Sequence, residues 1–480
     1  MPRDGSPRDA GPPEPVDAAP VEDSAGTDVG APADAKLPEG ANGSVDAALP
    51  SDATVDAVHG PAHMVVDLLP GPASSYSVPL GAAGDRVVFR AYLSGMGADP
   101  SIMSSDGTAA GTLALGVPSN AWPYTPGGGL MYLDAPITGA TALWRTDGTP
   151  TGTVMLADAF ASWVTGGAAP KGFTFALGRW FFSAEDLGPG GTSAHGYEPW
   201  TSDGTPAGTA PLGDLAPGPA SSVPGPFLLS GDRVLFSARD EAGHLRLWST
   251  DGTTGGTLSF FDLPAGTMSV TVAGSSLYYL TRSPYPDGST LWRTALTAGA
   301  APVEVYRFQP TWWPFLGLGT IGNLVFFTVE EHHDWRSVWR TDGTTAGTYP
   351  VGSGEIGPLD AVVLGGELFY VMDDGSLNRL WRTDGTPATQ VIAPDGHAIV
   401  RVARLAVLGG AIYFEGDVVG TDYHGALWRV APAGAFAVEA VRFDRVPGYS
   451  RPTLVVAAGG HVFFRAGDPQ HGVELWVFTP

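Results

Sequence analysis

The stretch "LWRTDGTPTGT", residues 143–153, decides the fold because close variants of it recur along the chain. A short apolar and aromatic run that follows a Gly precedes each copy, as in "GDRVVFRA" from Gly84. Nine copies are spaced by about 47 residues on average. The clearest variants are "PWTSDGTPAGT" from Pro199, "LWSTDGTTGGT" from Leu247, "VWRTDGTTAGT" from Val338 and "LWRTDGTPATQ" from Leu380.

This period predicts an all-β fold. Repeats of about 40 to 50 residues with several strands each are typical of β-propeller blades. The run after each Gly predicts one strand, "LWRT" the next and "GTVML" from Gly152 the third, followed by a variable fourth strand. We therefore predict a single large β-propeller of four-stranded antiparallel blades. Nine blades are expected, with eight as the alternative.

The two ends of the repeat region predict that the ring is closed by strands from both termini. The sequence "VVDLLPGPASS" at 65–75 matches "LGDLAPGPASS" at 212–222, which follows a DGT phrase. The first copy therefore begins at the last strand of a blade. The last copy stops at "GVELWVFTP", just before that strand. Joining the two would complete one blade and remove exposed sheet edges.

Residues 1–61 differ in composition from the propeller region predicted for residues 62–480. They are rich in Asp, Ala, Pro, Gly and Ser and contain no Phe, Trp or Tyr. Such a segment cannot bury enough apolar surface to offset its conformational entropy. We predict a disordered acidic tether, either a stalk for the propeller or an inert tail.

The overall composition excludes several functions. A net charge of −24 argues against nucleic-acid binding, which needs clustered Lys and Arg. The chain has no Cys, so disulfides, thiolate metal sites and Cys nucleophiles are excluded. No apolar run approaches the ~18 residues of a transmembrane helix. The first residues show no signal peptide, so either the protein stays inside or an export signal precedes Met1.

The recurring Asp residues are predicted to form turns. In "TDGTPTGT" the Asp147 carboxylate can accept hydrogen bonds from the backbone just ahead, and Gly148 supplies a positive φ. Calcium is the rival interpretation, but Ca²⁺ needs six to eight oxygens and each phrase offers one carboxylate. We therefore predict no metal and no cofactor. The predicted turn residues are Asp106, Asp147, Asp203, Asp251, Asp342 and Asp384.

The recurring Trp residues are predicted to pack between adjacent blades, where a large ring fills a tapering gap. An aromatic ligand cage is the alternative, but copies spread around a ring cannot converge on one ligand. Two of the nine copies keep the Trp and lose the DGT, which separates a packing role from a local turn role. The predicted core residues are Trp144, Trp200, Trp248, Trp292, Trp339, Trp381, Trp428 and Trp476.

The complete phrase resembles the repeat of bacterial ELWxxDGT repeat proteins. "GVELW" at 472–476 carries the first half of that motif and "LWRTDGTPTGT" carries the rest. The resemblance covers roughly residues 62–480. It implies architecture more than function, because the family has no established enzymatic activity.

The loops that do not repeat are the expected location of a site, since binding groups often lie on variable loops of a rigid scaffold. These loops include "SARDEAGHLR" from Ser237 and "TVEEHHDWRS" from Thr328. A metal site, a solvated loop and aromatic stacking on a sugar all remain possible for the candidates. The candidate ligand-binding residues are Trp122, Tyr124, Trp312, Trp313, His332, His333 and Asp334.

No GxSxG, HExxH or nucleotide-binding motif occurs, so we predict no catalytic residues and no enzyme. The leading expectation is a non-enzymatic, extracytoplasmic propeller that acts as a binding scaffold for an unknown protein or carbohydrate. One alternative is a propeller enzyme acting on carbohydrate, a glycoside hydrolase or lyase. A second is a structural component of the cell envelope. We expect a monomer.

Overall fold

A computed structural model describes residues 62–480, apart from 96, 98, 125–126, 162–168, 189–190, 285–286, 298, 333–334, 355, 374, 420–424, 433, 435 and 443–449. The predicted disordered tether, residues 1–61, therefore lies outside the described residues. Within them every regular element is a β-strand. None of them forms a helix that is long and apolar enough to cross a membrane.

The strands follow one another in groups of four along the chain. The first half contains β1 (His63–Met64); β2 (Val78–Ala83), β3 (Arg86–Ala91), β4 (Ser101–Ser105), β5 (Leu113–Ala114); β6 (Trp122–Pro123), β7 (Met131–Ile137), β8 (Ala140–Thr146), β9 (Val154–Phe160); β10 (Lys171–Ala176), β11 (Arg179–Leu187), β12 (Ser193–Ser202), β13 (Ala210–Pro211); β14 (Gly225–Ser230), β15 (Arg233–Arg239), β16 (Leu245–Thr250) and β17 (Leu258–Asp262). The second half contains β18 (Thr267–Ala273), β19 (Ser276–Ser283), β20 (Gly288–Ala295), β21 (Val303–Arg307); β22 (Trp313–Ile321), β23 (Leu324–His332), β24 (Trp335–Thr341), β25 (Tyr349–Gly354); β26 (Ile356–Leu364), β27 (Glu367–Asp373), β28 (Asn378–Thr383), β29 (Thr389–Gln390); β30 (Ile399–Val400); β31 (Ala406–Leu408), β32 (Ala411–Val418), β33 (Ala426–Val430), β34 (Val438–Arg442); β35 (Ser450–Ala458), β36 (His461–Asp468) and β37 (Gly472–Phe478).

Each group is an antiparallel meander, as the sequence predicts. Five groups form separate four-stranded sheets. The groups β6–β9 and β10–β13 are joined by one pairing of Asp186 with Phe160. The groups β26–β29 and β31–β34 are joined by the short strand β30, which pairs with both β28 and β32. The prediction of an all-β fold built from four-stranded antiparallel sheets is confirmed.

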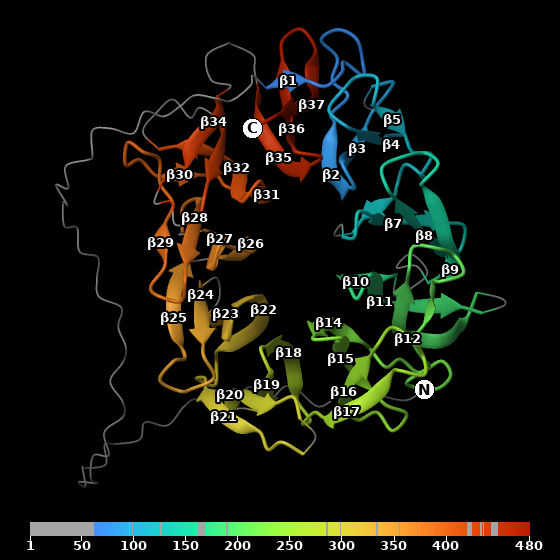
Figure 1. Ribbon diagram of the computed structural model, residues 1–480, viewed down its shortest axis with the longest axis vertical. Helices are drawn as coiled ribbons and strands as arrows, with labels where there is room; N and C mark the ends of the chain where they lie inside the picture. The colour runs from blue at the N-terminus through green and yellow to red at the C-terminus, as the bar shows by residue number, and fades with distance from the viewer. Residues whose placement is uncertain are drawn as a thin grey trace, which may run out of the picture. The chain divides into compact units, whose positions relative to one another are not determined.

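Strands from the two ends of the described chain pair with each other. Strand β1 is antiparallel to β37, with His63 opposite Val477 and Met64 opposite Trp476. The first strand of the last group, β35, also contacts the first strand of the first group, β2. Figure 1 shows the groups of the unit Val58–Pro480 following one another around a ring, with their first strands toward its centre.

Apolar side chains between neighbouring groups form the core. One cluster combines Phe181 of β11 with Phe227 and Phe236 of the next group, and Trp248 packs against it. Each of the other recurrent Trp residues belongs to, or packs against, a cluster of the same kind: Trp144, Trp200, Trp292, Trp339, Trp381, Trp428 and Trp476.

The DGT phrase forms the turn between the third and fourth strands. Asp147 Oδ1 accepts hydrogen bonds from the Thr149 backbone N–H at 2.8 Å and from its hydroxyl at 2.7 Å. Gly148 has a φ of 87°. A Cβ at Gly152 would lie 2.0 Å from Asp147 Oδ1, so a larger residue here would require the Asp147 side chain or the turn to shift. The same pair of Asp bonds occurs at Asp106, Asp203, Asp251, Asp342 and Asp384.

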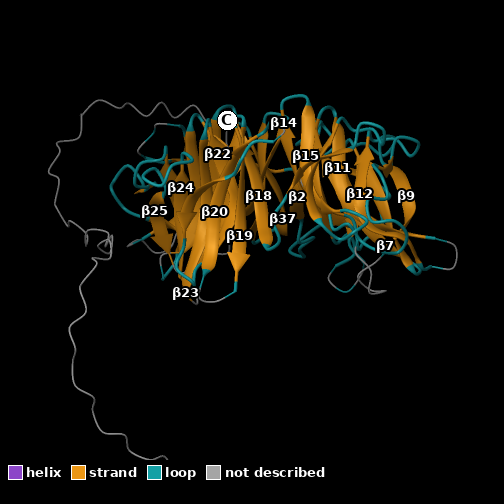
Figure 2. Ribbon diagram, turned by 90° about the horizontal axis from the view of Figure 1, so that it is seen from below, coloured by secondary structure: helices purple, strands orange, loops and turns teal. Residues whose placement is uncertain are grey.

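These turns also connect neighbouring groups. The Ser104 hydroxyl of β4 donates a hydrogen bond of 2.6 Å to the Gly148 carbonyl, and Arg145 Nε donates one of 2.8 Å to the Gly204 carbonyl. The DGT turns connect the third and fourth strands of a group, and loops such as β15–β16 connect the second and third. The two kinds of connection lie at opposite ends of the strands, because strand direction alternates in a meander. Loops gather at both ends of the strands in Figure 2.

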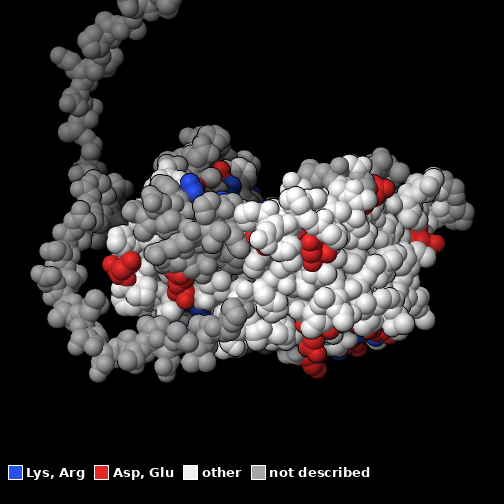
Figure 3. Space-filling view, turned by 90° about the horizontal axis from the view of Figure 1, so that it is seen from above, with Lys and Arg blue, Asp and Glu red and all other residues white. Residues whose placement is uncertain are grey.

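Acidic side chains do not form one patch on the side seen in Figure 3. They lie apart from one another there, among mostly uncharged residues. Charge complementarity on that side therefore does not single out a binding surface.

Candidate functional site

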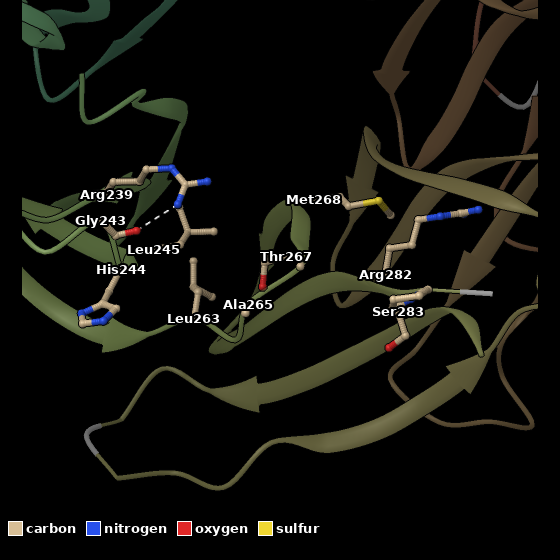
Figure 4. A pocket seen from close by; sticks show the side chains of 12 residues that line it. Arg239, Gly243, His244, Leu245, Leu263, Ala265, Thr267, Met268, Arg282 and Ser283 are labelled. Carbon is tan, nitrogen blue, oxygen red and sulfur yellow. Dashed lines mark hydrogen bonds between the residues drawn. The ribbon is translucent and has the colours of Figure 1, made fainter. Parts of the chain in front are cut away.

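A cavity of about 730 Å³ opens between the group β14–β17 and the group β18–β21. Figure 4 shows its walls: the end of β15 and the β15–β16 loop on one side, and the start of β18 with the end of β19 on the other. The volume lies in the range of small-ligand sites, about 300–1,000 Å³. The side chains that define its chemistry are Arg239, His244, Leu245, Leu263, Met268 and Arg282.

Arg239 is the last residue of β15, and its exposed side chain overhangs this cavity (Figure 4). Its Nη1 donates a hydrogen bond of 2.9 Å to the Gly243 carbonyl, which fixes the guanidinium against the β15–β16 loop. Within the described part of the chain no carboxylate lies within 4 Å of it. Most of its five N–H donors are therefore available to a ligand.

Arg282 of β19 lies on the opposite wall. Its guanidinium carbon is 3.3 Å from the centre of the Trp313 ring, and its Nη1 donates to the Trp312 carbonyl at 3.2 Å. Burial lowers the pKa of Arg282, although the group stays charged at neutral pH. Among the described residues no carboxylate pairs with it. The cavity thus has two arginines whose charge is not compensated by a nearby acid.

Between these arginines the wall is apolar. Leu263 is buried, Leu245 is half-buried and Met268 is 38% exposed toward the open side. The acid of the adjoining loop, Asp240, is engaged locally. Desolvation alone would raise the pKa of Asp240, but hydrogen bonds from the backbone N–H groups of His244 and Ala242 lower it. The arrangement suits a ligand with an anionic group attached to an apolar body.

The residues that the sequence suggested for ligand binding are not brought together. Trp122 is 59% exposed on β6, with the Arg90 guanidinium 5.8 Å from its ring centre. Tyr124 packs on Phe173 with ring centres 4.2 Å apart, and its hydroxyl donates to the Pro170 carbonyl. These residues belong to other groups than Trp313, so one small ligand cannot contact them all.

The remaining suggested residues have varied positions. Trp312 packs edge-to-face on Trp339, with ring centres 5.9 Å apart, while Trp313 holds Arg282 beside the cavity. His332 ends β23, and His333 and Asp334 lie outside the described residues. In the part of the chain that the structure describes, no three His, Asp or Glu residues are grouped as a metal site would require.

Sequence reasoning missed Arg239, His244, Met268 and Arg282. The loop "SARDEAGHLR" is one of the non-repeating loops, but its sequence does not single out Arg239, which lines the cavity. Arg282 lies near the end of the apolar strand β19, and nothing in the sequence marks it. Their proximity depends on how two consecutive groups pack, which no local pattern predicts.

Two histidines each contact a carboxylate, as the base of a catalytic triad does. His195 Nδ1 is 2.7 Å from Asp186 Oδ2, and His471 Nδ1 is 2.9 Å from Asp468 Oδ2. Within the described residues neither ring bonds to a Ser or Thr hydroxyl. Neither pair therefore forms the nucleophile–base arrangement of a hydrolase there.

No family model and no curated protein sequence matches the chain. Solved structures that resemble it include a puromycin hydrolase (15% identity, 71% of this chain and 57% of that chain, TM-score 0.40). Others are from a study of two prolyl endopeptidases (11%, 72% and 54%, TM-score 0.40) and oligopeptidase B from Leishmania major (12%, 72% and 53%, TM-score 0.36). The chain spans just over half the length of these structures.

These comparisons correct two expectations from the sequence. A non-enzymatic binding scaffold and the absence of enzymatic activity were expected, but the matching structures are peptidases. At these identities and TM-scores the likeness concerns the all-β fold and assigns no activity or substrate to this chain.

Proposed function

We propose that the chain recognises short peptides by their C-terminal residue, as the peptide-recognition part of a peptidase-type activity. The observation that carries the proposal is the Arg239 guanidinium, which overhangs an apolar-walled cavity and has no carboxylate partner among the described residues. A peptide C-terminus supplies the matching chemistry, because its carboxylate and its last side chain are attached to the same carbon atom.

The carboxylate would accept hydrogen bonds from Arg239, whose planar fork matches a carboxylate in a bidentate manner. The last side chain would then lie against Leu245, Leu263 and Met268 and leave water. Arg282 lies on the far wall, but its guanidinium stacks on Trp313 and donates to Ser289, Trp312 and Pro310, so Arg239 is the group that would bind the anion. A neutral sugar would leave the Arg239 charge without an anion.

The cavity needs a rigid frame, and we propose that this frame is one closed propeller of nine blades. The first strands of successive groups contact one another from β10 through β14, β18 and β22 to β26, and again from β31 through β35 to β2. The pairing of β1 with β37 supplies the last strand of the ninth blade. A closed ring would hold the walls on β15 and β19 at a constant separation.

Calorimetric titration with apolar tripeptides tests the proposal. Arg239→Gln should weaken binding at least tenfold, because a charge-assisted hydrogen bond contributes about 1.5–3 kcal/mol. Arg233→Gln is the matched control: Arg233 is the first residue of the same strand, and it donates to the Gly256 carbonyl at the other end. Equal affinities of wild type and Arg239→Gln would refute the assignment of the cavity.

Peptidase-type activity is tested separately from recognition. The same peptides are incubated with the full chain, and the products are measured by mass spectrometry. Cleavage that Arg239→Gln reduces and Arg233→Gln does not would support both parts of the proposal. Binding without any cleavage would leave recognition supported and refute turnover by the chain alone.

A further inference from the structure

A second cavity, of about 630 Å³, lies beside the β15–β16 loop, which also borders the cavity of Arg239. One wall is formed by residues 240–242 of this loop, and the other by the segment 214–217 that follows β13. Trp248 of β16 completes the lining. We call this the Trp248 cavity and the one described above the Arg239 cavity. Its volume also lies in the range of small-ligand sites.

The two cavities lie at successive junctions between groups. Trp248 packs against an apolar cluster that joins Phe181 of the group β10–β13 to Phe236 of the group β14–β17. The Arg239 cavity opens at the next junction, between the group β14–β17 and the group β18–β21. The β15–β16 loop therefore stands between two cavities that have different lining residues.

The Trp248 cavity carries a negative charge. Its acid Asp240 is compensated locally, because Arg246 Nε lies 3.3 Å from Asp240 Oδ2. Asp214 accepts a hydrogen bond of 3.0 Å from a neutral donor, the Gly218 backbone N–H, and Glu241 is exposed. Among the described residues no Lys, Arg or His forms an ion pair with either of these two acids. Two carboxylates at the cavity therefore keep an uncompensated charge.

The lining of this cavity suits an organic cation better than a metal ion. In the part of the chain that the structure describes, no three His, Asp or Glu residues are close enough together to hold a metal. Asp214 and Glu241 instead belong to different walls of a cavity that also contains the Trp248 indole ring. Leu215 and Pro217 add apolar surface. An indole ring attracts an ammonium group through its quadrupole, and the apolar surface can contact the carbon atoms attached to that group.

A second copy of the backbone arrangement at this loop forms without its charges. The Arg239 N–H donates a hydrogen bond of 2.7 Å to the Ser222 carbonyl. In the copy near the N-terminal end of the described chain, the Tyr92 N–H donates one of 2.8 Å to the carbonyl of Ser75, the counterpart of Ser222. Leu-Ser follows Tyr92 where Asp-Glu follows Arg239. The charges of Arg239 and Glu241 are therefore not needed to hold the backbone there, which leaves them available to a ligand.

One short peptide is long enough to reach both cavities. Arg239 and Glu241 are two residues apart, so their Cα atoms lie at most about 7 Å from each other. The two residues line different cavities. An extended peptide of three or four residues spans about 10–14 Å. Its two ends can therefore lie on the two sides of the β15–β16 loop.

We propose that the Trp248 cavity binds the free N-terminal ammonium group of the peptide whose C-terminal carboxylate binds Arg239. This assignment rests on the function proposed above. The carboxylates of Asp214 and Glu241 would accept hydrogen bonds from the ammonium group, and the Trp248 ring would lie against it. A Lys side chain has the same chemistry, but its flexible stem does not fix the distance from the ammonium group to the C-terminal carboxylate. The loop would therefore select short peptides with two free ends.

Calorimetric titration of the full chain with phenethylamine, at pH 7 and low ionic strength, tests the cavity with a cation that has no carboxylate. The amine should bind at least about fivefold more tightly than phenethyl alcohol, its neutral counterpart. Glu241→Gln should remove most of this preference. The control Asp232→Asn removes the same charge from the exposed β14–β15 turn, at the other end of the strand, and should retain the preference. Arg239→Gln should not weaken amine binding.

A second variant guards against a purely local effect at Glu241. Asp214→Asn keeps an oxygen that can accept the Gly218 N–H, so the segment after β13 should stay in place. It should also weaken binding of the amine relative to the alcohol. Equal binding of the amine and the alcohol by the wild type, or an amine preference that neither Glu241→Gln nor Asp214→Asn reduces, would overturn the proposal.

Three peptides identify the source of the ammonium group: Ala-Ala-Leu, its N-acetylated form, and N-acetylated Lys-Ala-Leu. The free peptide should bind at least about fivefold more tightly than its acetylated form, and Glu241→Gln should abolish this difference. If the acetylated Lys peptide binds as tightly as the free peptide, the cavity takes a Lys side chain and the assignment to the N-terminus is overturned.

The same titrations separate this inference from the function on which it rests. If the free and acetylated peptides bind equally well and both lose affinity in Arg239→Gln, the inference fails and the proposed function stands. If phenethylamine binds as expected and no peptide binds, the proposed function fails, and with it the peptide as the source of the ammonium group.

Discussion

Glu474 and Ser75 join the two ends of the described chain across 399 positions of sequence. The Glu474 carboxylate, which is fully buried, accepts hydrogen bonds from the Ser75 backbone N–H at 2.9 Å and from its hydroxyl at 2.5 Å. Glu198 makes the same two bonds with Ser222, only 24 positions away. The same arrangement therefore connects the two ends of the described chain and also fixes a loop between neighbouring strands.

Removing the Glu474 carboxylate should selectively increase the local opening of the paired chain ends. Glu474→Ala leaves the Ser75 N–H without its acceptor and should lower the free energy of unfolding in urea by about 1–3 kcal/mol. In hydrogen exchange the amides of Val65 and Tyr76, which bond to the Leu475 and Val473 carbonyls, should exchange faster. The matched variant Glu198→Ala should leave those two amides protected. Equal exchange in both variants would show that Glu474 does not hold the two chain ends together.

Stability should decrease as the pH rises from about 5 to 8. Burial raises the pKa of Glu415 from its usual 4.5 to about 7, so folding favours its protonated form. That contribution is complete below pH 4.5 and is lost as the pH rises through 7, by up to about 3 kcal/mol. Glu415→Gln cannot ionise, so its stability, measured by urea unfolding at each pH, should depend less on pH. The exposed control Glu304→Gln should retain the wild-type slope.

The DGT turn should show strong coupling between its Asp and its second Gly. Gly152→Ala places a Cβ against the Asp147 carboxylate, at 2.0 Å without rearrangement, and should destabilise the protein by more than about 1 kcal/mol. Asp147→Ala loses two hydrogen bonds but also removes the clash. The double variant should therefore be more stable than the sum of the single effects predicts, by 0.5 kcal/mol or more in a thermodynamic cycle. Additive effects would mean that the two residues do not interact.

The repeated features were predictable because each is determined locally. Asp147 makes its bonds within a few residues. Trp248 packs in an apolar cluster of the same kind as those of the Trp residues in the other copies. Matching sequences at the two ends predicted a shared sheet, and β1 pairs with β37 as expected. The short strand β30 was not predicted, because it lies in a variable segment between two groups.

The site was not predictable for the opposite reason. Arg239 and Arg282 belong to different copies, and each lies at the end of a strand with no distinctive sequence. Whether a charged side chain has a partner depends on the packing of neighbouring groups, and the sequence shows only how many charges there are. Aromatic residues such as Trp122 were predicted to bind a ligand because of their residue type, but they lie on strands of different groups and are not close together.

Comparison of a peptide acid with its C-terminal amide tests the central claim most directly. The two ligands differ only in the group that Arg239 should bind, so calorimetry on the wild-type chain isolates that contact. The free acid should bind at least tenfold more tightly than the amide, because the amide cannot form charge-assisted bonds with the guanidinium. Equal affinity for the acid and the amide would contradict recognition of the C-terminal carboxylate.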